Sequence, residues 1–190
     1  MSLKRHINNL PEWKRLPIQR AKKSNTEEPL ITLIQNKREI IIASDGSKAA
    51  TTSGSAWIFT YNKETILIEG HNPDIGIITE IHSHQAEIFG LLSALIFLEE
   101  YCRYYFIKFE STIQYHCDNL EVFNKVKVLQ SEKCLFDKAY KTTDRDAVLV
   151  LQELIPRNMT INHVKSHAEK QKKRNNLPYL RLSTRKKMIL

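Results

Sequence analysis

The apolar residues change their spacing near the middle of the chain, and this change restricts the fold more than any other feature. Before residue 80 the apolar runs are short and β-branched, whereas a helical stripe with a period near 3.6 begins at about residue 85. The expected elements are strands at 39–44, 55–61 and 64–69, a helix at 85–101, a strand at 112–117, helices at 119–129 and 144–155, and a strand at 159–164. Short connections between the first three strands indicate an antiparallel meander, and the later alternation indicates one α/β domain with a central mixed sheet.

The positive charge of the chain is concentrated at its two ends. The formal net charge is +8, and residues 1–23 carry seven Lys or Arg against the single acid Glu12. We expect a basic N-terminal extension or linker at 1–38, a folded domain at 39–170 and a basic, incomplete C-terminal segment at 171–190. Such ends favour a polyanionic partner, although solvated basic tails are a common alternative.

Composition excludes several classes of protein. No apolar run reaches the roughly 18 residues that span a bilayer, and the N-terminus lacks the apolar stretch of a secretory signal. The three cysteines are an odd number without a C-x-x-C spacing, which argues against a disulfide framework or a zinc knuckle. We therefore expect a soluble intracellular protein with no membrane partner.

Three acids stand beside the boundaries of the expected elements. Asp45 ends the first strand, Glu87 lies in the first turn of the long helix, and Asp118 ends the fourth strand. Each has an ordinary explanation as a turn or capping residue. If the first and fourth strands are neighbours, however, the three carboxylates converge, and converging carboxylates need a cation between them. Hard oxygen ligands of this kind suit Mg²⁺ or Mn²⁺.

Five motifs occur in an order that resembles the ribonuclease H family. They are Asp45-Gly46-Ser47, Gly54-x-x-Trp57, Gln85-Ala86-Glu87 with Gly90-Leu91-Leu92, Cys117-Asp118-Asn119, and Val164-Lys165-Ser166-His167. The set is most similar to the ribonuclease H domain at the end of retroelement reverse transcriptases, and it covers about residues 39–170. The resemblance implies a ribonuclease H-like fold: a five-stranded mixed sheet, antiparallel in strands 1-2-3 and parallel in 1-4-5, flanked by helices.

The resemblance also implies a function. It is that of an endonuclease that cuts the RNA strand of RNA–DNA hybrids with two Mg²⁺ or Mn²⁺ ions, which Asp45, Glu87 and Asp118 would hold. His167 would assist proton transfer or product release. The residues expected to contact the hybrid are Gly46, Ser47, Asn119, Lys165 and Ser166. An upstream reverse transcriptase domain is the implied protein partner.

The sequence departs from the family in one respect. The family has a fourth carboxylate, an aspartate that opens a helix after the histidine loop, and here the only acid after His167 is Glu169. We expect the chain to stop just short of that aspartate. Two functions therefore stay open: an active endonuclease, and a remnant that binds nucleic acid without cleaving it. The glutamate between two aspartates distinguishes the chain from the transposase–integrase branch of the fold, where the glutamate comes last.

The remaining histidines suggest a second type of metal site. His82, His84 and His116 could bind zinc or iron, but no fourth ligand stands at a suitable spacing. We expect His82 and His84 beside the substrate, at the N-terminus of the helix that carries Glu87. His163 lies in the last strand, where a structural role is expected.

Overall fold

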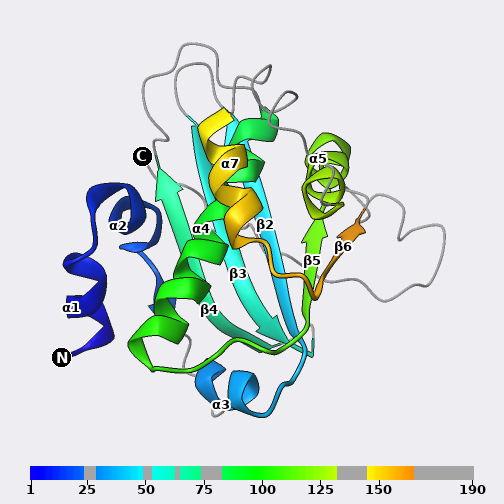
Figure 1. The fold of residues 1–190 in the computed structure, drawn as a ribbon. Helices are drawn as coiled ribbons and strands as arrows, with labels where there is room; N and C mark the ends of the chain where they lie inside the picture. The colour runs from blue at the N-terminus through cyan, green and yellow to red at the C-terminus, as the bar shows by residue number, and fades with distance from the viewer. Residues whose placement is uncertain (24–28, 49–52, 63–64, 74–82, 132–144, 165–190) are drawn as a thin grey trace.

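The computed structural model describes residues 1–23, 29–48, 53–62, 65–73, 83–131 and 145–164. Its elements are α1 (Leu3–Asn8), α2 (Glu12–Ile18), β1 (Lys22–Lys23), α3 (Leu30–Gln35), β2 (Ile40–Lys48), β3 (Ser53–Tyr61), β4 (Thr65–Pro73), α4 (Ser83–Tyr104), β5 (Ile113–Cys117), α5 (Leu120–Gln130), α7 (Arg145–Leu154) and β6 (Met159–His163) (Figure 1). Within this described part, no helix is both long enough and apolar enough to cross a membrane.

The sheet has six strands in the order β1-β4-β3-β2-β5-β6. Strands β2, β3 and β4 are antiparallel, while β2, β5 and β6 are parallel. The predicted arrangement of five strands is therefore confirmed. The sixth strand, β1, was not predicted: it is two residues long and pairs Lys22 with Glu69 and Lys23 with Ile68. A strand of two residues is too short to produce an alternating pattern.

The core lies between one face of the sheet and the long helix α4, with α7 beside α4 on the same side (Figure 1). Alternate residues of β2 and β3 point to this face, as the complete burial of Ile42 and Phe59 shows. The Trp57 ring stacks against Phe97 of α4 with centroids 5.2 Å apart. Helix α4 is almost wholly buried along its length because it is covered by the sheet, α2 and α7.

Residues 1–38 form more than the extension or linker that we expected. Helices α1, α2 and α3 bury apolar side chains in the same core as the sheet; these are Ile7, Ile18, Leu30, Leu33 and Ile34. Each helix has only six or seven residues. So short a helix contributes one or two apolar contacts and leaves no sustained period in the sequence, which is why the pattern here resembled a linker.

A buried ionic cluster fixes this N-terminal segment to α4. The Lys14 ammonium lies 2.8 Å from Glu100 Oε1 and 2.9 Å from Glu99 Oε2. The other oxygen of Glu100 is 3.2 Å from His6 Nε2, and the Glu100 side chain is only 1% exposed. Arg103 also reaches Glu100, at 3.2 Å. The cluster joins α1 and α2 to a helix more than 80 residues later in the chain.

Two expected boundaries need correction at the site itself. Strand β2 does not stop at Asp45-Gly46-Ser47, because it continues to Lys48 and pairs with β3 from Ile41 to Lys48. Its parallel pairing with β5 ends at Ala43, so Asp45 still lies where the two parallel strands separate. Helix α4 begins at Ser83, which puts Glu87 in the second turn rather than the first.

Candidate metal centre

The strand register brings Asp45 and Asp118 together. Ala43 of β2 is paired with His116 of β5 in parallel. Two residues further along each strand are Asp45 and Asp118, on the same face because side chains alternate with a period of two. The two aspartates therefore emerge side by side where β5 ends, as the sequence predicted.

Glu87 reaches the same point because helix α4 crosses β2 at very short range. A Cβ atom on Gly46 would lie 2.4 Å from Glu87 N and 2.6 Å from the carbonyl carbon of Ala86. On the helix, a Cβ atom on Gly90 would lie 2.9 Å from Ser44 Cβ. Any side chain at Gly46 would push the first part of α4 away from the strand. The glycine that looked like a turn residue is thus required for close packing.

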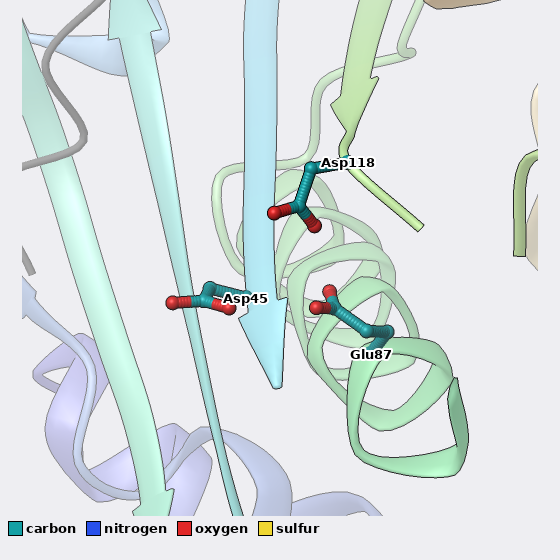
Figure 2. Close-up of side chains that lie close together, drawn as sticks. All are labelled: Asp45, Glu87 and Asp118. Carbon is teal, nitrogen blue, oxygen red and sulfur yellow. The ribbon is translucent and has the colours of Figure 1, made fainter. Parts of the chain in front are cut away.

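The three carboxylates form one compact group. Each of Asp45, Glu87 and Asp118 offers an oxygen that lies within 4.8 Å of the oxygens of the other two. Figure 2 shows the three side chains gathered at one place, Asp45 from within β2, Asp118 just after β5 and Glu87 from α4. Glu87 is 4% exposed, whereas Asp45 and Asp118 are partly open to solvent. The centre is therefore closed on the helix side and accessible from the strand ends.

Burial and mutual repulsion make this group poor at holding negative charge by itself. Burial is the main cause that raises the pKa of Glu87 to about 8; the hydrogen bond from the Gly46 amide acts in the opposite direction, and Asp45 and Asp118 raise the pKa further. The pKa of Asp45 is also raised, by burial first and by Asp118 second. Adjacent carboxylates that disfavour one another's ionisation are the arrangement that a bound cation relieves.

The residues present fit a divalent cation. Glu87 Oε2 is buried and has no hydrogen-bond partner, so one ligand oxygen is already withdrawn from water and unsatisfied. Within the described part of the chain, the potential ligands that come together are these three acids alone. An all-carboxylate set suits Mg²⁺ or Mn²⁺ rather than zinc, which prefers nitrogen and sulfur.

Two hydroxyl groups behind the carboxylates connect the three elements that carry them. The Tyr115 phenol on β5 lies 2.8 Å from Ser44 Oγ on β2. Ser44 Oγ is also 3.5 Å from the Glu87 backbone carbonyl on α4, as a weak donor. Tyr115 is fully buried, and burial raises its pKa well above the usual value, so the phenol stays protonated. This pair was not identified from the sequence. The only sign of it in the sequence is that each of the two core strands carries a polar residue on the face that points into the core.

The other predicted site residues have mixed positions. Ser47 is exposed and shares the face of β2 with Asp45, while Gly46 donates its backbone N–H toward the carboxylates. Asn119 caps α5: its Oδ1 accepts hydrogen bonds from the N–H groups of Glu121 and Val122 at 3.0 and 3.2 Å. Lys165, Ser166 and His167 lie outside the described residues, as do His82 and Glu169.

The described histidines do not join the carboxylate group. His84 Nδ1 lies 3.3 Å from Glu121, linking the start of α4 to α5. His116 is nearly buried and lies 3.4 Å from Gln114 Oε1. His163 Nε2 donates to the backbone carbonyl of Asp118 at 3.2 Å, so it supports the turn that presents this acid. That contact agrees with a structural role and was not anticipated.

The chain is similar to solved ribonuclease H1 structures. LC11-RNase H1, isolated from compost and solved in complex with an RNA/DNA hybrid, has 20% identity and a TM-score of 0.48, over 69% of this chain and 87% of its own. Ribonuclease H1 from the archaeon Halobacterium salinarum has 18% identity and a TM-score of 0.47, over 70% and 89%. No protein-family model matches the sequence, and neither does any curated protein.

Proposed function

We propose that this protein is a metal-dependent endonuclease of the ribonuclease H type, acting on the RNA strand of RNA–DNA hybrids. The observation that carries the proposal is the convergence of Asp45, Glu87 and Asp118 within 4.8 Å, with one buried and unsatisfied carboxylate oxygen. The motif order and the sheet topology support it. The proposed cofactor is a pair of Mg²⁺ or Mn²⁺ ions, which in such sites activate water and neutralise charge on the phosphate.

The residues of the chain would share the remaining work. Asp45 and Asp118 face the accessible side, so they would meet the phosphate region of a bound strand. The backbone of α4 at Glu87 packs directly on Gly46, and the Gly46 amide donates to the Glu87 carboxylate. These two contacts restrict the position of the carboxylate. His167, outside the described residues, is proposed as the group that handles a proton. The 2′-hydroxyl is the feature that would distinguish the RNA strand from DNA.

Two finer assignments remain proposals from the motifs. We propose a retroelement origin and an upstream reverse transcriptase domain as the partner, on the strength of the motif set from Asp45 to His167. In the sequence given, the only acid after His167 is Glu169, and the family's aspartate at this point is not found; this departure motivates a second candidate function. That candidate is a protein that binds the hybrid and no longer cleaves it.

The test is cleavage of an end-labelled RNA–DNA hybrid in Mg²⁺ and in Mn²⁺, with the Asp45→Asn variant beside the wild type. We expect the RNA strand alone to be cut, and the variant to lose at least about a hundredfold in rate because a ligand charge is removed without a change of size. Thermal unfolding with and without Mn²⁺ gives an independent measure of metal binding, since a ligand of the native state raises the midpoint.

Asp146→Asn is the matched control, because Asp146 is an exposed acid on α7 outside the carboxylate group. It should leave both cleavage and the Mn²⁺ effect unchanged. Cleavage that survives Asp45→Asn would refute the assignment of the centre. Hybrid binding without any cleavage in either metal would favour the second candidate.

A further inference from the structure

A second feature of the molecule lies on the other side of β3 from the carboxylates. A cavity of about 580 Å³ separates the N-terminal segment from strand β4 and the end of α4. Its walls come from α1, β1, α3, β4 and α4. This volume is within the usual range for a pocket that holds one small ligand.

The cavity is a built part of the fold. Lys14 and His6 tie α1 and α2 to the buried Glu100, and Ile18, Leu30 and Ile34 anchor the same segment in the core. In addition, the side-chain amide of Asn72 on β4 donates to the Pro17 carbonyl of α2 at 3.0 Å, which joins the N-terminal segment directly to the sheet. The wall formed by the N-terminal segment is therefore held in place by buried contacts on several sides.

The charged residues that line the cavity in the described part of the chain are cationic. Four exposed cationic residues line it, namely Lys4, Arg20, Lys22 and Lys23. Among the described residues, no Asp or Glu lines it. Lys14, the nearby lysine that is neutralised by Glu99 and Glu100, is not part of the lining. Lys22 lies opposite the exposed Glu69 in the strand register, so Lys4, Arg20 and Lys23 are the lining cations most available to an anionic ligand. Phosphate groups are the anions that such clusters attract most strongly.

The floor of the cavity is apolar and aromatic. Tyr105 is 38% exposed and packs against the buried Tyr101, with ring centroids 4.7 Å apart and the ring planes tilted by 51°. Phe97 and Ile68 line the interior. A half-exposed ring that is held from behind by a second ring is a rigid platform for another flat group. Cations at the rim and an aromatic floor together match a phosphate joined to a base.

One edge of the cavity is close to the carboxylate centre along the sheet. Ala56 of β3 pairs with Asp45 on one side and with His71 on the other, and His71 lines the cavity. Two strand spacings separate Asp45 from His71, which is roughly 10 Å between backbones. The aromatic end of the cavity is further away, because Tyr105 follows the end of α4 while Glu87 is near its start, a separation of about 27 Å along the helix axis. A single strand of several nucleotides is therefore needed to reach from one site to the other.

We propose that this cavity binds a nucleotide of a single-stranded stretch that extends from the nucleic acid at the carboxylate centre. The inference rests on the proposed function for its substrate class. A duplex keeps its bases stacked inside and its phosphates outside, so it cannot place a base on the floor of this cavity. A single strand can unstack one base onto Tyr105 while Lys22, Lys23 and Arg20 hold its phosphates.

The test compares binding of a short blunt RNA–DNA hybrid with the same hybrid carrying a single-stranded overhang of several nucleotides, with Ca²⁺ replacing Mg²⁺ to suppress cleavage. The overhang should tighten binding by wild-type protein about tenfold. In the Lys22→Gln/Lys23→Gln variant this gain should largely disappear, and the salt dependence of overhang binding should weaken. Tyr105→Leu, which keeps the charge, should lose at least about fivefold on the overhang substrate and nothing on the blunt one.

Lys37→Gln/Lys108→Gln is the matched control, because both lysines are exposed, pair with Glu110 and do not line the cavity. It should keep the full overhang gain. No overhang gain in the wild type, or equal losses on blunt and overhang substrates, would overturn the proposal. Cleavage assays in Mg²⁺ are read separately: a protein that shows the overhang gain but never cuts retains the cavity assignment and loses the nuclease assignment.

Discussion

Helix α4 carries two buried glutamates whose surroundings are opposite. Glu100 is 1% exposed and is surrounded by Lys14, His6 and Arg103. Glu87, about 13 residues earlier and 4% exposed, faces Asp45 and Asp118 and keeps one oxygen without a partner. Burial would raise the pKa of Glu100, but hydrogen bonds from Lys14 and His6 hold it below its usual value. Burial and the two aspartates raise the pKa of Glu87 to about 8.

This difference separates an acid that stabilises the fold from one that awaits a ligand. At Glu100 the chain supplies its own cations, so the charge is satisfied in the folded protein and holds the N-terminal segment to the helix. At Glu87 the described part of the chain supplies acids and one amide, so a satisfied charge there requires a cation from solution. Buried carboxylates without a protein partner are uncommon, and they concentrate at functional sites.

The largest effect on stability is expected from removing a cation that neutralises Glu100. Lys14→Met keeps much of the apolar length and removes the ammonium, which leaves Glu100 with His6 and Arg103 only. We expect a loss of about 3 kcal/mol in the free energy of unfolding, because the buried Glu100 carboxylate loses its shortest ionic contact and removing a partner of a buried charge is strongly destabilising. Urea denaturation measures it.

Arg5→Met is the control for this change, because Arg5 is an exposed cation on α1 outside the cluster. It should change the free energy of unfolding by less than about 0.5 kcal/mol. If Lys14→Met lost as little stability as Arg5→Met, His6 and Arg103 would be sufficient to neutralise Glu100. The comparison between the two glutamates would then rest on different partners.

A smaller effect on stability is expected from pH, and the two glutamates should respond to it in opposite directions. The pKa of Glu87 is higher in the folded protein than its ordinary 4.5, so its contribution is fully present below that value and is lost as the pH rises toward about 8. The pKa of Glu100 is lowered, so its contribution is present above 4.5 and is lost as the pH falls. The metal-free protein should therefore lose stability in both directions for different reasons.

Glu87→Gln tests whether ionisation of Glu87 causes the loss of stability at alkaline pH. In EDTA it should stabilise the protein by about 2 kcal/mol near pH 8 and have little effect near pH 4, because a neutral amide needs no counter-charge. Urea denaturation across this range gives the result. Excess Mn²⁺ should flatten the same decline in the wild type and not alter the variant. An unchanged slope in Glu87→Gln would assign the alkaline loss to another group.

The smallest effect concerns the hydroxyl pair behind the acids. Tyr115→Phe removes the bond to Ser44 that joins β5 to β2 and leaves the packing nearly intact. We expect about 1 kcal/mol less stability and a few-fold weaker Mn²⁺ binding, because Glu87 and Asp45 are then less firmly placed relative to each other. Isothermal titration with Mn²⁺ measures the second quantity.

Ser44→Ala should reproduce the Tyr115→Phe result, and the double variant should add little to either change. Such non-additivity is expected when two residues act through one bond. Independent, additive losses in the two variants would show that the pair does not act as a unit at the carboxylate centre.

Much of the fold could be predicted because its information is local. The strands around Ile42, Phe59 and Tyr115 have runs long enough to show their period, and α4 has 22 residues over which a helical stripe is visible. Asp45 and Asp118 could be placed together because the order of strands and helices restricts the ways in which a sheet can form. The one misjudged detail at Asp45-Gly46 arose because glycine after aspartate is also the commonest sign of a turn.

The sequence by itself therefore determined the order of the elements, the five-stranded core of the sheet and the convergence of two strand-borne aspartates with a helix-borne glutamate. Only the tertiary structure decided that Gly46 serves close packing, that residues 1–38 join the core, and that Glu100 is neutralised while Glu87 is not. The physical reason is separation along the chain. Lys14 and Glu100 are 86 residues apart, and a contact between two distant side chains leaves no pattern around either of them. Local periodicity specifies an element, whereas the charge that a buried acid meets depends on what the fold packs against it.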